Sequence, residues 1–441
     1  MKKIPSSQLA RGGIVGSTAM KIGFGKLKTK AKRPFLTEQN KQKSDEQQLD
    51  AEADLLFKAI TQLRGTAVKL AQMLGMETEL LPDRIRDELS KSYHQVPPLN
   101  KVLVSKVILN EFGVRPETLF KSFDMNAIAA ASLGQVHRAE LGNGQQVAVK
   151  VQYPGIHVTI ESDLKLLSKL ATNLPKLSQK ARHAKKEIIE ASIAEIGDRL
   201  IDETNYVLEA ENTQWFKQEL NIEGVQVPAV YEDFSGERVI TTELMDGKHL
   251  DDWLEGDPPQ AARNKAAQLI YDAFVESSMD LGRLHADPNP GNYLFKPDGS
   301  IALIDFGCVK RLDRDFIENL PELLHAFSIA DYEKIVAAYA KVGTTLQSGR
   351  EQDYETVLKP FGEWLSLPFQ EASFDFKENS NYTSSGFDLI HKLTEMPSIE
   401  SVQEDFIFFD RTVYGLFKVF ERMQATVFMR DKWEHRWDNS Q

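Results

Sequence analysis

The chain has 441 residues, of which 41% are hydrophobic and 27% charged, and its formal net charge is −12. This length exceeds what one small core needs and predicts two or more lobes of a globular protein. The acidic balance of charge argues against general nucleic-acid binding. The single cysteine excludes an intramolecular disulfide and indicates a reducing compartment. No apolar run reaches the roughly 18 residues of a membrane-spanning helix.

The first 37 residues carry nine Lys or Arg and no acidic residue. One interpretation is a solvated, flexible tail, as basic termini often are. The other is a weak anchor on anionic lipid head groups, to which each basic side chain near the surface contributes about 1 kcal/mol. A secretory signal is not expected, because glycines break the apolar stretch. We therefore expect a cytoplasmic protein, with peripheral contact to an anionic membrane surface as the second interpretation of the tail.

Helices are predicted before the first strand. Residues 38–53 are polar and rich in Gln, which indicates a linker. The segment "LLPDRIRDEL" and residues Val102 to Phe112 each predict a helix. Ahead of both, apolar residues recur at spacings of four and three, which is one buried stripe of a helix: Leu56, Ile60, Leu63, Ala67, Leu70 and Leu74.

Short strands are predicted from Phe123 onward. The turn in "GNG" suits a hairpin, and the strand after it has apolar residues at every second position: Val147, Val149 and Val151. A long helix is expected over about residues 184–218, followed by two strands in "VQVPAVYEDFSGERVITTELMDG". Beyond Leu250, helical periodicity dominates, interrupted by a hairpin around Asp305.

This order of elements predicts an α+β fold of the two-lobed, kinase-like type, with an added N-terminal helical extension. We expect a tail and linker over residues 1–50 and the extension over 51–115. A lobe built on a small antiparallel sheet would span 116–247, and a helical lobe that carries the catalytic and metal loops would span 248–441.

Lys150 lies on the face of its predicted strand that is opposite the valines, and Ala148 shares that face. A small residue beside a lysine leaves room for a flat ring next to an ammonium group that binds phosphate. The alternative is an exposed lysine on an edge strand.

Two glutamates lie on or near the apolar stripe of the predicted long helix. Glu203 takes a place within the stripe, where an unpaired carboxylate would be costly, and Glu209 lies at its border. An acid in such a position favours a cation or a metal as its partner. The alternative, a glutamate that reaches the surface, suits Glu209 better than Glu203.

The stretch "HADPNPGN" and the following "LIDFGC" carry the strongest chemical signal. Asp287, Asn292 and Asp305 follow the order of the phosphoryl-transfer pattern, in which one Asp positions the reacting hydroxyl while an Asn and a later Asp hold Mg²⁺. We expect His285 to support the loop through backbone hydrogen bonds, since no second His or Cys stands at ligand spacing. Cys308 is interpreted as a packed small residue.

These motifs together resemble the AarF/UbiB family of atypical kinases, which includes the coenzyme Q biosynthesis kinase-like proteins. The resemblance covers roughly residues 55–330 and is carried by "LRGTAVKLAQML", "AIAAASLGQVH", "VAVKVQYPG", "HADPNPGN" and "LIDFG". It implies binding of ATP and Mg²⁺, with quinone-biosynthesis proteins or lipids as partners.

The resemblance also implies roles for individual residues. Lys150 would be the nucleotide lysine and Glu209 its helix partner, and Glu243 to Met245 would form the adenine hinge. Asp287 would be the catalytic acid, with Asn292 and Asp305 as metal ligands. An alanine loop would lie against the nucleotide in place of the usual glycines, together with the small residue of the lysine strand: Ala129, Ala130, Ala131, Ser132 and Ala148.

The N-terminal signature of the family would place Lys69 and Gln72 over the active site, with Glu203 as the first acid of the ExD motif. This chain departs from the family at Ala71, where the signature has Gly, and at Asn205, where the motif has Asp. An alanine run also favours helix and is stiffer than a glycine loop, so we expect a looser phosphate cradle.

Three functions stay open at this point. The first is an atypical kinase or ATPase that supports ubiquinone biosynthesis or lipid homeostasis, with ATP hydrolysed or used conformationally rather than spent on protein phosphorylation. The second is a small-molecule phosphotransferase of the aminoglycoside or choline type. The third is a nucleotide-gated scaffold without significant turnover.

Overall fold

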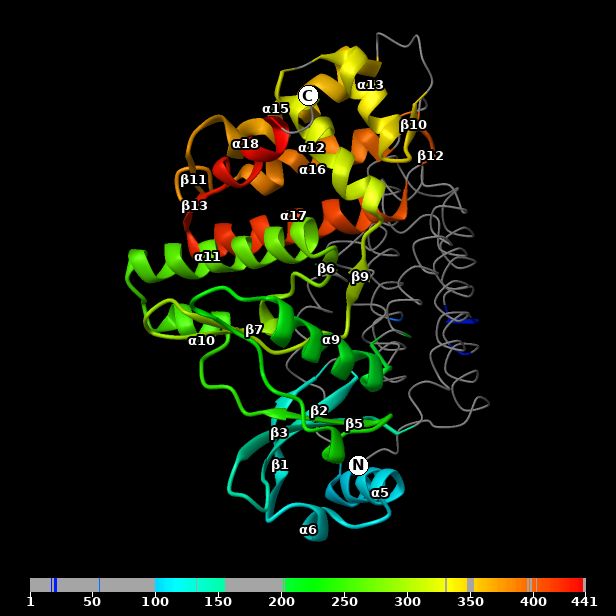
Figure 1. The fold of residues 1–441 in the computed structure, drawn as a ribbon, viewed down its shortest axis with the longest axis vertical. Helices are drawn as coiled ribbons and strands as arrows, with labels where there is room; N and C mark the ends of the chain where they lie inside the picture. Colours follow the sequence, from blue (N-terminus) through cyan, green and yellow to red (C-terminus); the bar gives the residue numbers. More distant parts are fainter. Residues whose placement is uncertain are drawn as a thin grey trace, which may run out of the picture. The chain divides into compact units, whose positions relative to one another are not determined.

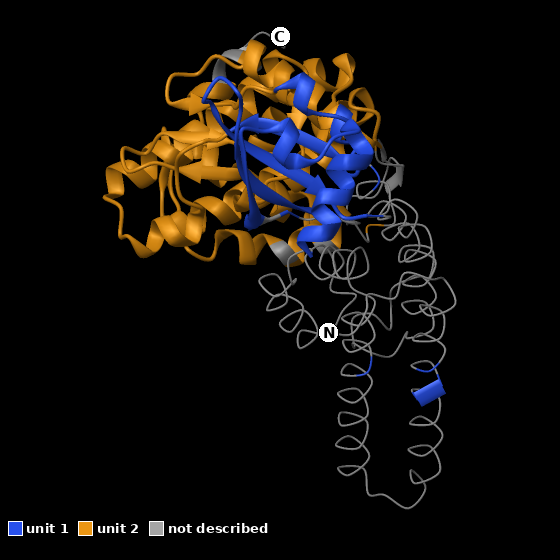
Figure 2. Cartoon of the chain, turned by 90° about the horizontal axis from the view of Figure 1, so that it is seen from below, with its two compact units in different colours: residues 1–207, 231–243 blue, residues 208–230, 244–441 orange. Residues whose placement is uncertain are grey.

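The computed structural model describes residues 100–438 except 132, 155–200, 202, 330, 347–352, 395, 397–398 and 402, together with Ser17, Met20, Lys21 and Leu55. The predicted helices around 56–74 and 80–89 lie outside the described residues. The chain forms two compact units (Figure 2). Unit 1 contains the described residues up to Val207 and Tyr231–Glu243, and unit 2 contains Leu208–Val230 and Leu244 onward.

Unit 1 is a four-stranded antiparallel sheet with helices beside it (Figure 1). The strand order is β1-β2-β3-β5, and every neighbouring pair is antiparallel. Its elements are α5 (Lys101–Phe112), α6 (Pro116–Leu119), β1 (Ser122–Ala130), β2 (Gly134–Glu140), β3 (Gln146–Gln152), η3 (Glu232–Phe234) and β5 (Val239–Glu243).

The predicted valine alternation is confirmed in β3. Val147, Val149 and Val151 are fully buried, whereas Ala148 and Lys150 are half-buried on the other face. The valines pack with Val104, Val107 and Ile108 of α5, so the sheet and this helix share one core. The predicted helix of residues 102–112 is also confirmed. Asn100 caps its N-terminus, where the Asn100 side chain accepts from the Val102 N–H, and Gly113 with φ +72° ends it.

The alanine run does not form a helix. Ala129 and Ala130 lie in β1 opposite Val136 and Gln135, and the Ala131 N–H donates to the Gly134 carbonyl at 3.1 Å. Strand pairing with β2 satisfies these backbone groups and overrides the helix propensity of alanine. Buried His137 of β2 supports β1, because its Nδ1 bonds the Asp124 carbonyl at 2.7 Å. Burial also lowers the pKa of the His137 imidazole.

The predicted helix over 184–218 is confirmed at its C-terminal part but is interrupted at residues 203–205. Residues 155–200 lie outside the described residues, Glu203 and Thr204 form a turn, and α9 spans Tyr206–Glu219. The Thr204 N–H and hydroxyl both donate to the Ile201 carbonyl, at 3.0 and 2.6 Å, and so close the turn. Buried Gln152 at the end of β3 donates to the Thr204 carbonyl at 2.8 Å, which ties the turn to the sheet.

The two predicted strands of residues 225–247 separate into different sheets. β5 completes the sheet of unit 1, whereas β4 (Val225–Gln226) pairs in parallel with β8 (Ile301–Leu303) in unit 2. The hairpin expected around Asp305 is formed by β7 (Tyr293–Phe295) and β8, which pair antiparallel, and it ends just before Asp305 instead of enclosing it. β9 (Val309–Arg311) pairs with β6 (Arg283–His285), so Asp305 lies between two separate ladders.

Unit 2 is mainly helical (Figure 1). Its helices and helical turns are α10 (Leu250–Glu255), α11 (Gln260–Val275), η4 (Glu276–Asp280), η5 (Pro290–Asn292), α12 (Arg314–Ser328), α13 (Tyr332–Lys341), η6 (Tyr354–Leu358), α15 (Lys359–Gln370), α16 (Tyr382–Thr394), α17 (Glu404–Met423) and α18 (Asp431–Asp438). Short strand pairs join the later helices: β10 (Thr345–Leu346) with β12 (Ile399–Ser401), and β11 (Ser373–Asp375) with β13 (Thr426–Phe428).

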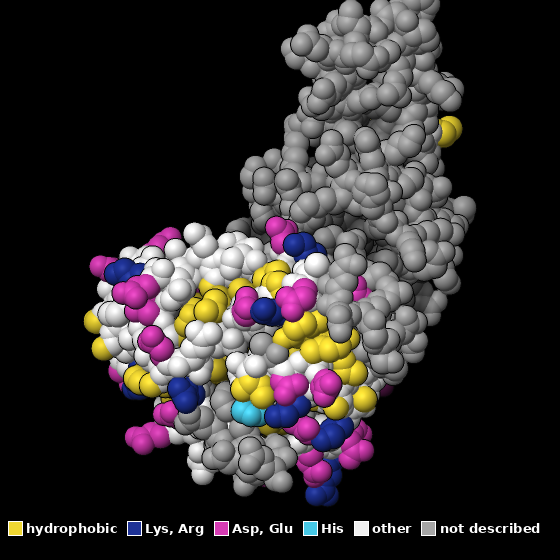
Figure 3. Space-filling model, turned by 90° about the horizontal axis from the view of Figure 1, so that it is seen from above, with side chains coloured by type: hydrophobic (Ala, Val, Ile, Leu, Met, Phe, Trp, Pro, Cys, Tyr) yellow, Lys and Arg dark blue, Asp and Glu magenta, His cyan; other side chains and the backbone are white. Residues whose placement is uncertain are grey.

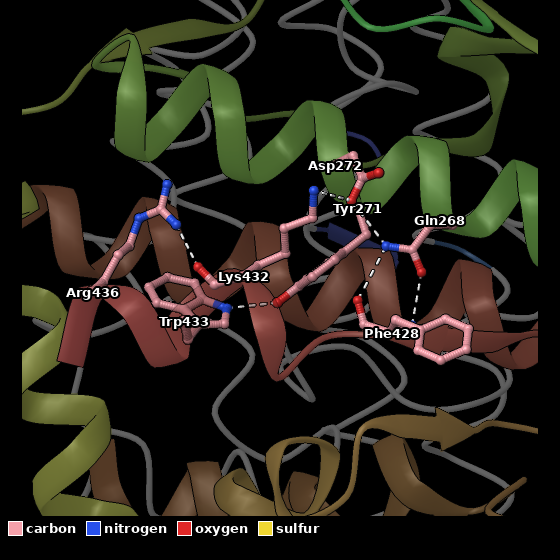
Figure 4. Close-up of polar contacts among 7 residues, drawn as sticks. All are labelled: Gln268, Tyr271, Asp272, Phe428, Lys432, Trp433 and Arg436. Carbon is pink, nitrogen blue, oxygen red and sulfur yellow. Dashed lines mark hydrogen bonds and ion pairs between the residues drawn. The ribbon is translucent and has the colours of Figure 1, made fainter. Parts of the chain in front are cut away.

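The C-terminal segment is fastened to α11 by polar contacts (Figure 4). The Trp433 indole N–H donates to the Tyr271 hydroxyl at 2.6 Å, and Lys432 pairs with Asp272 at 3.0 Å. Gln268 accepts from the Phe428 N–H at 2.7 Å and donates to its carbonyl at 3.1 Å. Together these contacts hold α11, β13 and α18 against one another.

Acidic and basic side chains alternate on the face drawn in Figure 3, with apolar side chains between them. Exposed pairs such as Arg314–Glu318 and Lys341–Glu322 show the same mixture of charges. The described residues on this face therefore form no large patch of one sign of charge. Within the described part of the chain, no helix is long and apolar enough to span a membrane.

Candidate functional site

The loop after β6 is held rigid by its own hydrogen bonds. The Asn292 amide donates to the Asp287 carboxylate at 2.8 Å and to the Asp287 carbonyl at 3.1 Å. The Asn289 side chain accepts from the Gly291 N–H at 2.9 Å, and the Asn292 N–H donates to the Asn289 carbonyl at 3.0 Å. Asp287 and Asn292 are thus brought together, as the sequence predicts, and the amide oxygen of Asn292 is left to act as an acceptor.

Backbone contacts place Asp305 beside this loop. The Ile304 N–H donates to the Asn292 carbonyl at 3.0 Å, and the Ala286 N–H donates to the Cys308 carbonyl at 2.9 Å. The Asp305 carboxylate accepts from the Gly307 N–H at 3.0 Å. His285 Nε2 bonds the Asp305 carbonyl at 2.7 Å, so the expected backbone-supporting role of His285 is confirmed.

Two helices, α17 and α9, pack against the loop after β6 and the residues that follow Asp305. A methyl group added at Gly415 of α17 would overlap the ring of Pro288, so glycine is needed there for the loop to pack closely on the helix. From α9, the Asn212 amide donates to the Phe306 carbonyl at 3.2 Å. Asn212 was not singled out from the sequence, although its place three residues after Glu209 on a buried helix face could have indicated it.

The donor set of unit 2 fits Mg²⁺. Asp287, Asn292 and Asp305 offer carboxylate and amide oxygens, which are hard ligands, and Mg²⁺ in proteins commonly uses one or two carboxylates and takes further ligands from water and phosphates. No group of three or more His, Cys, Asp or Glu side chains stands at metal-binding spacing among the described residues.

Tyr293 follows the loop and packs beside it. Burial raises the pKa of its hydroxyl, and the nearby Asp287 carboxylate raises it further. The phenol is therefore a neutral group next to the acid of the loop, and sequence reasoning did not single it out.

In unit 1, Lys150 lies over an aromatic ring. Its ammonium group is 5.1 Å from the ring centroid of Tyr206, a buried residue at the start of α9. A Cβ atom at Gly134 would lie 2.8 Å from the Tyr206 hydroxyl and 2.5 Å from the Val151 carbonyl oxygen, so only glycine leaves room for this ring. The ring under Lys150 was not expected from the sequence.

The other residues expected at the nucleotide are distributed as follows. Ala148 shares the face of Lys150, and Ala129 is half-buried near the end of β1. Glu243 ends β5 opposite Val147, and Met245 is half-buried in the segment that follows. Ser132 lies outside the described residues, as do Lys69 and Gln72 of the extension.

The burial of the two glutamates is the reverse of the prediction. Glu209 is 3% exposed on the inner face of α9, with Asn212 and Phe216 on the same face. Glu203 is half-buried in the turn before the helix and so does not lie in a helical stripe. Because the helix begins only at Tyr206, the apolar rhythm that ran through Glu203 in the sequence does not correspond to one continuous face.

Comparison with known proteins gives one consistent family. Residues 91–339 match the ABC1 atypical kinase-like domain. The chain is 31% identical over 300 residues to the chloroplast protein ACTIVITY OF BC1 COMPLEX KINASE 8 of Arabidopsis thaliana, and 30% identical over 341 residues to the mitochondrial atypical kinase COQ8 of Saccharomyces cerevisiae. These alignments cover 67% and 75% of this chain but only 39% and 66% of the relatives.

A solved structure shows the same fold. The Rv3197–erythromycin complex from Mycobacterium tuberculosis superposes with a TM-score of 0.59 over 89% of this chain and 97% of that chain, at 23% identity. The predicted kinase-like α+β fold with a small antiparallel sheet and a helical lobe is therefore confirmed. Since the domain match covers more than half of the chain and the relatives agree with it, the chain belongs to the ABC1 atypical kinase-like family, also called AarF/UbiB.

Proposed function

We propose that the chain is an ATP- and Mg²⁺-dependent atypical kinase or ATPase that supports isoprenoid quinone (ubiquinone) biosynthesis or lipid homeostasis. The observation that supports it best is the direct hydrogen bond between Asn292 and Asp287, with Asp305 held beside them by the bond from the Ile304 N–H to the Asn292 carbonyl. The quinone and lipid parts follow from family membership alone.

The residues divide the chemistry between them. Asn292 and Asp305 would hold Mg²⁺, which would neutralise charge on the phosphates of ATP. Asp287 would accept the proton of the attacking hydroxyl or water, and its hydrogen bond from Asn292 fixes its orientation. Lys150 would hold the phosphates from the sheet of unit 1, with Glu209 as its helix partner and Glu243 to Met245 against the adenine.

The test is Mg-ATP turnover by the full chain, with anionic liposomes added and omitted. Asp287→Asn should lower turnover by about 10²- to 10⁴-fold, which is the usual contribution of a general base, while it leaves nucleotide affinity nearly unchanged. Lys150→Ala should weaken nucleotide binding itself. Tight nucleotide binding with no turnover under any condition would favour the scaffold.

Phosphate transfer distinguishes the remaining possibilities. Robust labelling of a general protein substrate would contradict the proposed use of ATP. Labelling of an amino-alcohol or aminoglycoside instead would identify a small-molecule phosphotransferase, with the same three residues in the same roles.

A further inference from the structure

A small cavity lies next to the catalytic segment within unit 2, with His285 and Tyr293 in its lining. Most of the wall is aromatic or aliphatic and comes from α9, α11, β8 and α17. Ser277 and Thr412 add two hydroxyl groups to it. The free space is of the order of one water molecule, so the cavity excludes a nucleotide or a drug-sized ligand.

His285 presents an unsatisfied nitrogen here. The residue is 8% exposed, and Nε2 bonds the Asp305 carbonyl at 2.7 Å. A carbonyl oxygen can only accept, so Nε2 carries the hydrogen. Nδ1 is buried and has no hydrogen-bond partner among the described residues. Buried polar atoms nearly always have a partner, so this nitrogen indicates a ligand.

The hydroxyl groups of the cavity are arranged as acceptors. Thr412 donates to the Phe408 carbonyl at 2.8 Å and Ser277 to the Phe274 carbonyl at 3.4 Å, which leaves oxygen lone pairs on both. Ser277 lies in the π-helical turn η4 that follows α11, and such wide turns often occur at functional sites. Apart from His285, the lining contains no acidic or basic side chain, so the fitting ligand is small, neutral and able to donate twice.

We propose that this cavity is a specific site for one water molecule, which donates a hydrogen bond to Nδ1 of His285 and a second one to a hydroxyl oxygen of Ser277 or Thr412. A donor at Nδ1 keeps the imidazole hydrogen on Nε2, because the bond made by one ring nitrogen decides which nitrogen is protonated. The water thereby holds the hydrogen bond to Asp305, and His285 is a positioning residue for that metal ligand.

The test is nitrogen NMR of the full chain with ¹⁵N-labelled histidine, in which His285 is assigned by the signal lost in His285→Gln. We expect hydrogen on Nε2, an Nδ1 resonance displaced upfield as for a hydrogen-bonded acceptor, and a cross-relaxation peak between the His285 ring and water. Ala273→Leu would fill the cavity, and should move Nδ1 downfield and abolish the water peak.

The matched control is Ala326→Leu, which adds the same volume at another buried alanine that does not line the cavity. It should leave the His285 signals unchanged. If Ala273→Leu does not fold, Thr412→Val keeps the shape of the side chain and removes one acceptor, and should weaken the water peak. A hydrogen on Nδ1, or an Nδ1 resonance of an unbonded lone pair with no water peak in the unaltered chain, would overturn the proposal.

The consequence for metal binding rests on the proposed function and has a separate readout. A glutamine at position 285 can still donate to the Asp305 carbonyl, whereas an asparagine is too short. We expect His285→Asn to weaken the Mg²⁺-dependent binding of ATP by about 10- to 100-fold, as is usual when a residue that hydrogen-bonds to a metal ligand is lost. His285→Gln should weaken this binding much less. Failure of ATP binding in the unaltered chain would contradict the proposed function but would leave the NMR result standing.

Discussion

At the scale of single residues, the ring of Tyr206 under Lys150 is expected to affect nucleotide binding. A lysine ammonium over an aromatic face gains about 0.5 to 2 kcal/mol, more when water is excluded, and Tyr206 is buried. Tyr206→Leu should therefore weaken Mg-ATP binding by about two- to thirty-fold, whereas Tyr206→Phe keeps the ring and should bind normally. Calorimetric titration of both variants measures this. An equal loss in both would assign the effect to the hydroxyl group instead.

Asp410 on α17 is a second residue with a defined consequence, this time for stability. Burial raises the pKa of its carboxyl to about 6, and the charge of Arg411 opposes the rise only in part. Because the folded pKa of Asp410 lies above the unfolded one, the contribution of this carboxyl to stability is most favourable below pH 4 and falls by at most about 3 kcal/mol as the pH rises past about 6.

Asp410→Asn removes this ionisation. The difference in free energy of unfolding between Asp410→Asn and the unaltered chain should grow by up to about 3 kcal/mol from pH 4 to pH 7, in favour of the variant. Denaturant unfolding at both pH values measures this, and any effect of the amide that does not depend on pH cancels. A difference that is the same at both pH values would show that the carboxyl ionises as freely in the folded chain as in the unfolded one.

At the scale of elements, α17 supports the loop that carries Asp287 and Asn292. Gly415→Ala would force the helix and Pro288 apart, and overpacking of this kind costs about 1 to 3 kcal/mol. Because Pro288 follows Asp287 directly, we expect turnover to fall by at least tenfold, while the fold persists. Turnover is measured below the melting temperature, on protein shown to be folded by circular dichroism.

Gly386→Ala on α16 is the matched control for this experiment. A methyl group there would overlap Trp364, which is another overpacked contact in unit 2 but involves no residue of the loop. It should lower stability and leave turnover per folded molecule unchanged. If both variants lost turnover equally, general loosening of unit 2 would explain the loss, and the contact between α17 and Pro288 would not be its cause.

Local sequence leaves the partners of several elements open. The alanine run favours helix by propensity and lies in a region where short strands are expected, and the backbone partners supplied by β2 decide for the strand. Val225–Gln226 has the residues of a strand, but only the fold decides that it pairs with β8 and not with the sheet of unit 1. The β3 valines were predictable because a sheet with one buried face imposes a period of two on the sequence itself.

At the scale of the whole molecule, the chain passes between the two units at Val207–Leu208, Val230–Tyr231 and Glu243–Leu244. The residues proposed for the nucleotide are correspondingly shared: Lys150 belongs to unit 1, and Glu209 and Asp287 belong to unit 2. Neither unit carries the complete set of proposed residues by itself.

Also at this scale, the basic segment of residues 1–37 is the part of the chain that would contact a membrane surface. Replacing its nine Lys and Arg by Gln would remove roughly 1 kcal/mol of lipid attraction for each charge near the surface. The full chain should sediment with anionic vesicles at low salt, and the variant should remain in the supernatant. Neutral vesicles are the control, and equal sedimentation of both proteins would exclude the anchor.

The sequence by itself determined the family, the order of the motifs, the β3 alternation and the pairing of Asp287 with Asn292, because these depend on residue type at short spacing. The tertiary structure decided what depends on distant neighbours. It buries Glu209 and not Glu203, places Tyr206 under Lys150, and brings His285 to a cavity shared with α11 and α17. Burial and partner choice are set by segments far apart in the chain, which a local pattern does not contain.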